Sequence, residues 1–186
     1  KMITTGGGGM VVTNDGGLAE RIKHLSTQAK NDSVEYDHDE VGYNYRLTNI
    51  QAAMGVAQME CLDKFVEIKR KNAFGYQNLI SSIDGIEFLW EKPWVKSNFW
   101  FYTVKVSNGH KKSLMDYLIS KNIQVRPIWK PIHTLPMYEY CQAYKIENTI
   151  NIYETAFNLP CSVSLKEDEI LFVVKNINEY FTRLHT

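Results

Sequence analysis

The sequence has no net charge and no long apolar run, and both absences narrow the possible functions. Lysine plus arginine and aspartate plus glutamate each total 21 of the 186 residues. Without a basic excess or a basic block, nucleic acid is not the expected partner. No apolar run approaches the length of about 18 residues that a membrane span needs, so no membrane partner is expected. The start of the chain also lacks the basic-then-apolar order of a secretory signal.

Cysteine is scarce, which excludes a disulfide-stabilised scaffold. The three cysteines, Cys61, Cys141 and Cys161, are odd in number and lack the spacing of metal-ligand pairs. We therefore expect no metal site and reduced thiols in a cytoplasmic protein. Apolar residues make up 44% and charged residues 23%, which is ordinary for a globular protein with a real core.

The first part of the chain, residues 1–82, begins with two short runs of strand-forming residues. Four glycines separate residues 2–5 from residues 10–13, which predicts a tight hairpin. A helix is expected over 18–25. Residues 26–47 are polar and rich in tyrosine, which is typical of an ordered functional loop rather than a linker.

A long helix is predicted after Thr48, a suitable N-cap, and it extends to about residue 79. A break is expected near Leu62 and Asp63. Spacings of three and four residues predict one buried apolar stripe, formed by Ile50, Met54, Ala57, Cys61, Phe65 and Ile68. Because no predicted sheet covers this stripe, we expect a larger domain before residue 1 or a partner chain.

The second part, residues 83–186, has the pattern of a small α/β domain. A strand is predicted over 98–107, a helix over 111–121, a short strand over 122–126 and a terminal helix over 166–183. Taken together, the patterns predict an α/β protein with two parts.

Three segments carry residues suited to chemistry. Lys1 precedes "MITTGGGG" and is either an exposed lysine beside a turn or an amine presented as a nucleophile, which requires a lowered pKa. A phosphate-binding loop is disfavoured because no Gly-Lys-Ser/Thr ends the glycine run.

The other two segments suit anionic ligands. "GYNYRLTNIQAAMGVAQMECLD" is either a loop capped into a helix or a site where Asn44 and Arg46 hold a phosphate or carboxylate. In "VRPIWKPIHTLPMY", prolines fix the backbone around Arg126, Trp129, Lys130 and His133. A lone histidine is more often structural, but its neighbours here favour an anionic ligand.

These segments, followed by "FNLPCSVSLKEDEI", occur in the order found in sugar aminotransferases of the DegT type. The resemblance spans nearly the whole chain and implies the C-terminal part of the pyridoxal-phosphate-dependent, aspartate-aminotransferase fold. Residues 1–82 then complete the large cofactor-binding domain, and residues 83–186 form the small domain.

The resemblance also implies roles for individual residues. Lys1 matches the lysine that forms the Schiff base with pyridoxal phosphate. Asn44 matches the asparagine that reaches the cofactor phosphate of the partner subunit, and Arg46 lies at the same shared site. His133 matches a histidine near the sugar nucleotide. From their chemistry, we add Arg126 and Lys130 for the diphosphate and Trp129 for packing on a sugar or base.

Two departures from the family pattern stand out. Gly6–Gly9 replaces the usual Gly-Glu-Gly-Gly, and the family's first half does not precede Lys1. The sequence is therefore expected to be either a C-terminal fragment or a chain divided at a modified lysine.

The function implied is transfer of an amino group from an amino acid, expected to be glutamate, to a keto group of a nucleotide-linked sugar. A UDP-4-keto-6-deoxy sugar is favoured as substrate, and a homodimer with shared active sites as the assembly. The alternatives are a relative that binds cofactor or sugar without catalysis, and a sugar dehydratase. The dehydratase type generally has histidine at the lysine position, so Lys1 argues against it.

Overall fold

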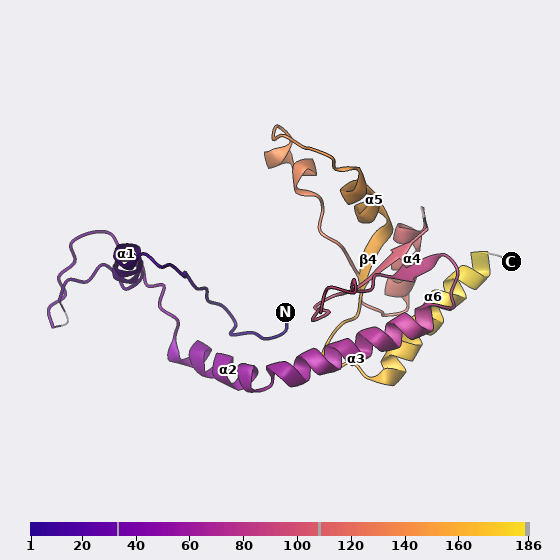
Figure 1. Ribbon diagram of the computed structural model, residues 1–186, viewed down its shortest axis with the longest axis horizontal. Coiled ribbons are helices and arrows are strands. Elements are labelled where there is room, and N and C mark those ends of the chain that lie inside the picture. Colours follow the sequence, from indigo (N-terminus) through magenta and orange to yellow (C-terminus); the bar gives the residue numbers. More distant parts are fainter. Residues whose placement is uncertain (33, 108, 185–186) are drawn as a thin grey trace. The chain divides into compact units, whose positions relative to one another are not determined.

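A computed structural model describes residues 1–32, 34–107 and 109–184, which form two compact units, Lys1–Leu62 and Asp63–Thr186. Figure 1 shows the order of the elements along the chain. The division lies about twenty residues before the predicted boundary. The reason is that Ala73, Tyr76 and Ile80, from the helix expected in the first part, are buried in the core of the second unit.

The start of the first unit is not the predicted hairpin. Residues 1–15, all of them described, contain no strand. Instead, Thr4 Oγ1 accepts a hydrogen bond from Gly6 N over 3.0 Å, and Thr5 Oγ1 donates to the Gly7 carbonyl. Such short side-chain bonds engage backbone groups that a strand ladder needs. Helix α1 (Gly16–Ser26) then begins at Asp15, whose side chain accepts from Leu18 N over 3.0 Å.

The loop after α1, predicted to be an ordered functional loop, is joined to itself and to α1 by side-chain and backbone contacts; position 33 lies outside the described residues. Arg21 forms a two-point ion pair with Glu40, and His24 Nε2 lies 2.8 Å from Asp39 Oδ1. We call these four residues the α1 clasp. Backbone bridges join Thr27 to Asn44 and Lys30 to His38.

The predicted long helix is broken where expected. Helix α2 (Asn49–Glu60) begins with a capping box formed by Thr48 and Gln51, and α3 (Leu62–Ile80) follows after Cys61. On α2 the predicted stripe residues Ile50, Met54 and Ala57 are exposed in this chain, as expected of a face that a preceding domain or a partner chain would cover. Periodicity in the sequence identifies an apolar face, but it does not show which segment or chain packs on that face.

The second unit is built on a four-stranded antiparallel sheet of order β1-β2-β4-β3. The strands are β1 (Ile86–Phe88), β2 (Tyr102–Val106), β3 (Arg126–Pro127) and β4 (Ala156–Leu159). The predicted strand over 98–107 contains β2, but only Arg126 remains from the strand predicted over 122–126. Asn122 has a left-handed φ of 60°, which a regular strand does not accept.

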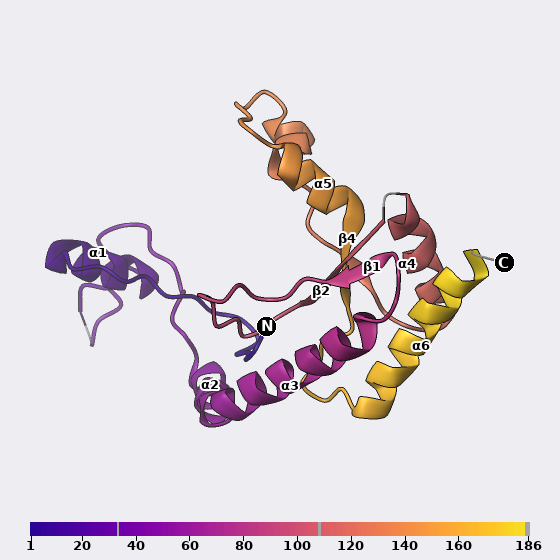
Figure 2. The ribbon, with the colours of Figure 1, turned by 45° about the vertical axis from the view of Figure 1, so that its right-hand side comes forward.

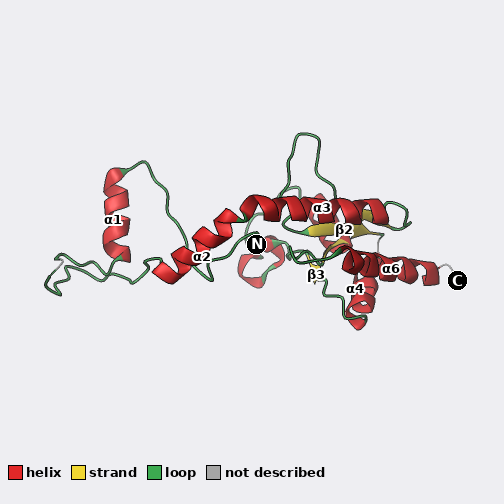
Figure 3. Cartoon of the chain, turned by 90° about the horizontal axis from the view of Figure 1, so that it is seen from below, coloured by secondary structure: helices red, strands yellow, loops and turns green. Residues whose placement is uncertain are grey.

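Three helices supply most of the remaining core. Apolar residues of α3, α4 (His110–Ser120) and α6 (Glu167–Leu184) pack with Tyr102, Val104 and Phe157 of the sheet. Figure 2 and Figure 3 show these helices beside the strands. The helices predicted over 111–121 and 166–183 are thus confirmed. The structure adds α5 (Glu147–Thr155) and two short 3₁₀ helices, η1 (Ile132–Thr134) and η2 (Pro136–Tyr138).

Among the described residues, no helix combines the length and the apolar character that crossing a membrane requires.

Candidate functional site

The glycine segment of the first unit lies against the residues that precede α2. Gly8 has φ +121°, which favours glycine, and a Cβ built there would lie 3.0 Å from Leu47 Cδ1. A Cβ on Gly7 would lie 3.3 Å from Gln51 Nε2. The glycines therefore allow the backbone after Lys1 to approach the segment that carries Arg46.

A cleft of about 720 Å³ in the first unit brings Arg46 and the glycine segment together. It is lined by Gly8, Gly9, Met10, Val11, Ile22, Ser26, Tyr45, Arg46, Leu47 and Gln51. Backbone near glycines and a guanidinium group are both suited to an anionic ligand. Lys1, whose side chain is exposed, is not part of this lining.

Asn44 does not line the cleft; backbone contacts of its own segment fix its position. Its backbone pairs with Thr27, and the flanking rings of Tyr43 and Tyr45 stack with centroids 5.1 Å apart. Because Gly42 contacts the backbone of Gln28 and Ala29 without room for a Cβ, the segment has little freedom to slide. The exposed Asn44 side chain therefore projects from an anchored strand-like segment.

The second unit holds the remaining predicted residues on one segment. Arg126 lies on β3 opposite Asn158 of β4, and Trp129 and Lys130 follow as exposed side chains. His133 lies within η1, which is closed by Thr134 donating from both its backbone N–H and its hydroxyl to the Pro131 carbonyl. Proline and this short helix thus order the segment, as the sequence predicted.

Sequence reasoning missed residues that lie behind this segment. Trp129 packs against Trp100 and Phe101, with ring centroids 5.8 and 5.3 Å apart. Lys69 of α3 is buried, and its Nζ donates to the carbonyls of Trp100, over 2.8 Å, and of Cys161. Burial lowers the pKa of Lys69. The sequence does carry a signal for Trp100 and Phe101, the consecutive aromatics of "FWFY", although the pattern predicts a plain strand there.

His24, Asp39 and Glu40 lie close enough together to hold a metal ion. Arg21, however, occupies both carboxylate oxygens of Glu40, and His24 lies within hydrogen-bonding distance of Asp39. The arrangement is accounted for by the α1 clasp itself. Its effect is to hold the loop that leads to Asn44 and Arg46.

The fold defines a class of protein. The structure resembles the aminotransferase TlmJ from Streptoalloteichus hindustanus with a TM-score of 0.87 at 22% identity, covering 100% of this chain and 50% of that one. It also resembles Helicobacter pylori PseC, an aminotransferase involved in the biosynthesis of pseudoaminic acid, with a TM-score of 0.78 at 22% identity over 92% of this chain and 48% of that chain. The chain therefore has the α/β fold of the C-terminal part of such enzymes.

The sequence identifies the family within that class. Residues 1–178 match the DegT/DnrJ/EryC1/StrS aminotransferase family, to which this chain belongs. It is 40% identical over 174 residues to EpsN of Bacillus subtilis, a protein named provisionally as a pyridoxal phosphate-dependent aminotransferase, covering 91% of this chain and 45% of that protein. It is 37% identical to the GDP-perosamine synthase of Escherichia coli O157:H7, over 98% of this chain and 50% of that protein. The chain thus spans about half the length of these relatives.

Proposed function

We propose that this chain is the C-terminal half of a pyridoxal-phosphate-dependent aminotransferase acting on a nucleotide-linked sugar. The observation that carries the proposal is the family match over residues 1–178, which begins at the lysine before the glycine segment. When bound, pyridoxal phosphate supplies an electron sink for negative charge that develops on the amino donor. The protein's part is to hold and orient the cofactor and the substrates and to move protons between them.

Lys1 has the central role in this proposal. Its Nζ would hold the cofactor and would then act as the base that moves the α-proton of the amino donor to the cofactor. Gly6 and Gly8 support the role, because their left-handed φ angles let the backbone beyond Lys1 turn beside the cleft that contains Arg46. We infer that the amino donor is glutamate, as the family resemblance implies.

Asn44 and Arg46 are proposed to serve the neighbouring subunit of a homodimer. Asn44 would donate to the cofactor phosphate, and the guanidinium of Arg46 would bind an anion in the same shared site. Both side chains are exposed in this chain, and the helix that follows has an exposed face containing Ile50, Met54 and Ala57. A second copy that covers this face would bring two equivalent sites together.

The segment Arg126–His133 is proposed to hold the sugar nucleotide. Arg126 and Lys130 are exposed cations suited to the diphosphate, Trp129 offers a ring face to a sugar or base, and His133 lies near the sugar. The resemblance of the segment suggests a UDP-4-keto-6-deoxy sugar. Relatives at 31–37% identity are named for a GDP sugar, whereas those named for UDP sugars are 26–27% identical. These identities favour GDP over UDP as the nucleotide. We therefore propose, as the substrate class, a 4-keto-6-deoxy sugar linked to a nucleoside diphosphate.

A half-reaction tests the chemistry without knowledge of the sugar. The full-length protein, loaded with cofactor, is mixed with glutamate and no acceptor. We expect about one equivalent of 2-oxoglutarate per cofactor, because the amino group stays on the enzyme. A relative that binds without catalysis, or one of the dehydratase type, gives none, and that result would refute transamination.

Hybrid dimers test the shared sites. Lys1→Ala and Asn44→Ala/Arg46→Ala proteins are co-expressed, so that one site of each hybrid combines intact Lys1 with intact Asn44 and Arg46. Activity is then expected to exceed the sum of the two parents. If hybrids form without rescue, although both variants fold and dimerise, these residues act within their own subunit.

The cytoplasm, where the three cysteines stay reduced, is the proposed compartment.

A further inference from the structure

Three aromatic side chains of the second unit form a cluster that we call the aromatic shelf: Trp100, Phe101 and Trp129. The rings of Trp100 and Phe101 stack with centroids 4.4 Å apart and planes inclined by 26°. Trp129 meets Phe101 edge-on at 72° and lies tilted against Trp100. Trp129 is 70% exposed, while the other two rings are partly buried beside it. Trp100 and Phe101 are therefore partly covered by their neighbours, and Trp129 is the ring of the shelf that is most accessible to a ligand.

The backbone is bent to build this shelf. Consecutive side chains of a regular strand point to opposite faces, so two adjacent rings stack only where the strand is interrupted. Phe99 has φ +48°, an unfavourable value for a bulky residue. Asn98 Oδ1 and Ser97 Oγ each accept a backbone hydrogen bond over 3.0 Å, from Trp100 N and Phe99 N. Strain that is held in place in this way tends to occur at functional sites.

Side chains of α3 support the same bend from below. Lys69 Nζ donates to the Trp100 carbonyl, and the hydroxyl of Tyr102 donates to the Lys69 carbonyl over 2.9 Å. The guanidinium of Arg70 lies 5.4 Å from the ring centroid of Phe99 and donates to the Ser97 carbonyl. Phe99 and the aromatic shelf are thus held against α3 by two charged side chains, Lys69 and Arg70. Of these, Lys69 is buried.

We propose that the aromatic shelf stacks on the nucleobase of the sugar nucleotide, an assignment that rests on the proposed function. Ring faces suit a flat base, because every base has a π-face that stacks on an aromatic side chain. Arg126 and Lys130, exposed on the same segment as Trp129, are placed by sequence to meet the diphosphate that follows the base. Stacking tolerates different bases, so the shelf accepts either uracil or guanine.

Calorimetry on the full-length protein tests the shelf with UDP, GDP and inorganic pyrophosphate as probes. Trp129→Ala is compared with Trp94→Ala, which removes a tryptophan that is 81% exposed on the loop between β1 and β2. We expect Trp129→Ala to weaken binding of a nucleoside diphosphate by about tenfold or more. Pyrophosphate binding is expected to stay within about twofold, because pyrophosphate has no base to stack. Trp94→Ala is expected to change neither affinity, and Trp129→Phe, which keeps a ring, to retain most of the nucleotide affinity.

Each contrary outcome overturns the proposal. Unchanged UDP and GDP affinities in Trp129→Ala, or no binding of either nucleotide to the wild-type protein, excludes the shelf as a base site. Equal weakening of pyrophosphate shows a role in the diphosphate site or in local structure. An unchanged nucleotide affinity with a raised KM for the sugar nucleotide assigns the shelf to the sugar. The glutamate half-reaction is read separately, so a failed shelf is distinguishable from a failed transaminase.

Discussion

Lys69 and Trp100 are joined by a hydrogen bond of 2.8 Å from Nζ to the carbonyl oxygen, across 31 positions of sequence. Lys69 also donates to the carbonyl of Cys161, and its own carbonyl accepts from the Tyr102 hydroxyl. A buried lysine therefore links α3, the approach to β2 and the segment after β4. Its hydrogen bond to the Trp100 carbonyl makes it a structural residue beside the aromatic shelf.

Replacing Lys69 by methionine removes the ammonium but keeps much of the side-chain volume. The partly buried carbonyls of Trp100 and Cys161 then lose a donor, at a cost of about 1–3 kcal/mol for each group left unsatisfied. We expect denaturant unfolding of the full-length protein to show a loss of that order. Lys64→Met, at an exposed position of the same helix, should change stability by less than about 0.5 kcal/mol. Equal effects of the two substitutions would show that the hydrogen bonds of Lys69 contribute nothing particular.

Gly42 allows two backbone segments of the first unit to approach each other closely. A Cβ at Gly42 would lie 2.3 Å from Ala29 N and from the Gln28 carbonyl carbon, and backbone atoms cannot rotate away. Gly42→Ala is therefore expected to displace the Asn44 segment and to lower the free energy of unfolding by about 1–3 kcal/mol, together with a loss of activity. Gly16→Ala is the matched control, because nothing lies within 4 Å of the added Cβ. Wild-type stability and activity in Gly42→Ala would contradict the placement of this loop.

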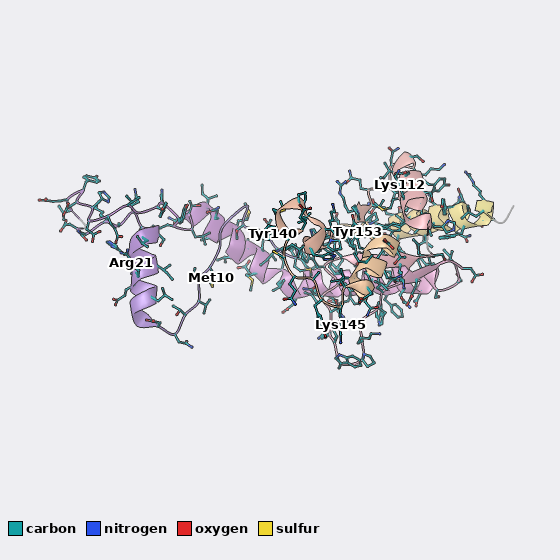
Figure 4. All side chains as sticks on the ribbon, turned by 90° about the horizontal axis from the view of Figure 1, so that it is seen from above. Met10, Arg21, Lys112, Tyr140, Lys145 and Tyr153 are labelled. Atoms are coloured by element: carbon teal, nitrogen blue, oxygen red, sulfur yellow. The ribbon has the colours of Figure 1, made fainter. Side chains whose placement is uncertain are left out.

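The α1 clasp is expected to affect local order more than overall stability. Arg21 is half-exposed, and exposed ion pairs contribute about 0.2–1 kcal/mol. Arg21→Met should therefore leave the melting temperature nearly unchanged but speed amide hydrogen exchange over residues 36–42. Lys112→Met, which breaks an exposed ion pair with Asp116 on α4, should alter neither quantity there. Figure 4 shows Arg21 and Lys112 on their two helices. Unchanged exchange in Arg21→Met would mean that backbone bridges alone hold the loop.

The ion pair between Arg70 and Glu91 predicts a pH dependence. The hydrogen bond from Arg70, followed by one from Ser97 N, lowers the pKa of Glu91 from 4.5 to about 2. A carboxyl with a lowered folded-state pKa stabilises the fold above its ordinary value, and the contribution is lost as the pH falls through about 2. The carboxyl group of Glu91 should therefore remain ionised at pH 3.5. The NMR chemical shift of its carboxyl carbon, assigned by comparison with Glu91→Gln, measures this. Titration near 4.5 would show that the pair does not persist in solution.

Local patterns predicted the helices well, because periodicity and caps are properties of neighbouring residues. Thr48 and Gln51 supply the capping box of α2, and the helix predicted over 166–183 is α6, on which Ile170, Val174 and Ile177 are buried. The strands β1 and β4 were missed, since runs of three and four residues become strands only by pairing with β2.

The candidate site was predictable only in part, for the same reason. Arg46 and Trp129 lie in segments of unusual composition, which made them visible without a structure. Lys69 gave no such signal, because its partners Trp100 and Cys161 are 31 and 92 positions away. The threonine hydrogen bonds that replace the predicted hairpin also depend on left-handed glycine backbone, which sequence permits but does not require.

The most direct test of the whole account is the position of the cofactor. The full-length protein is loaded with pyridoxal phosphate, reduced with borohydride, digested and mapped by mass spectrometry. We predict the cofactor tag on Lys1, and no tag and no turnover in Lys1→Arg, because a guanidinium stays protonated and does not attack an aldehyde. A tag on another lysine, or none in cofactor-loaded protein, would contradict the assignment of Lys1 and the function built on it.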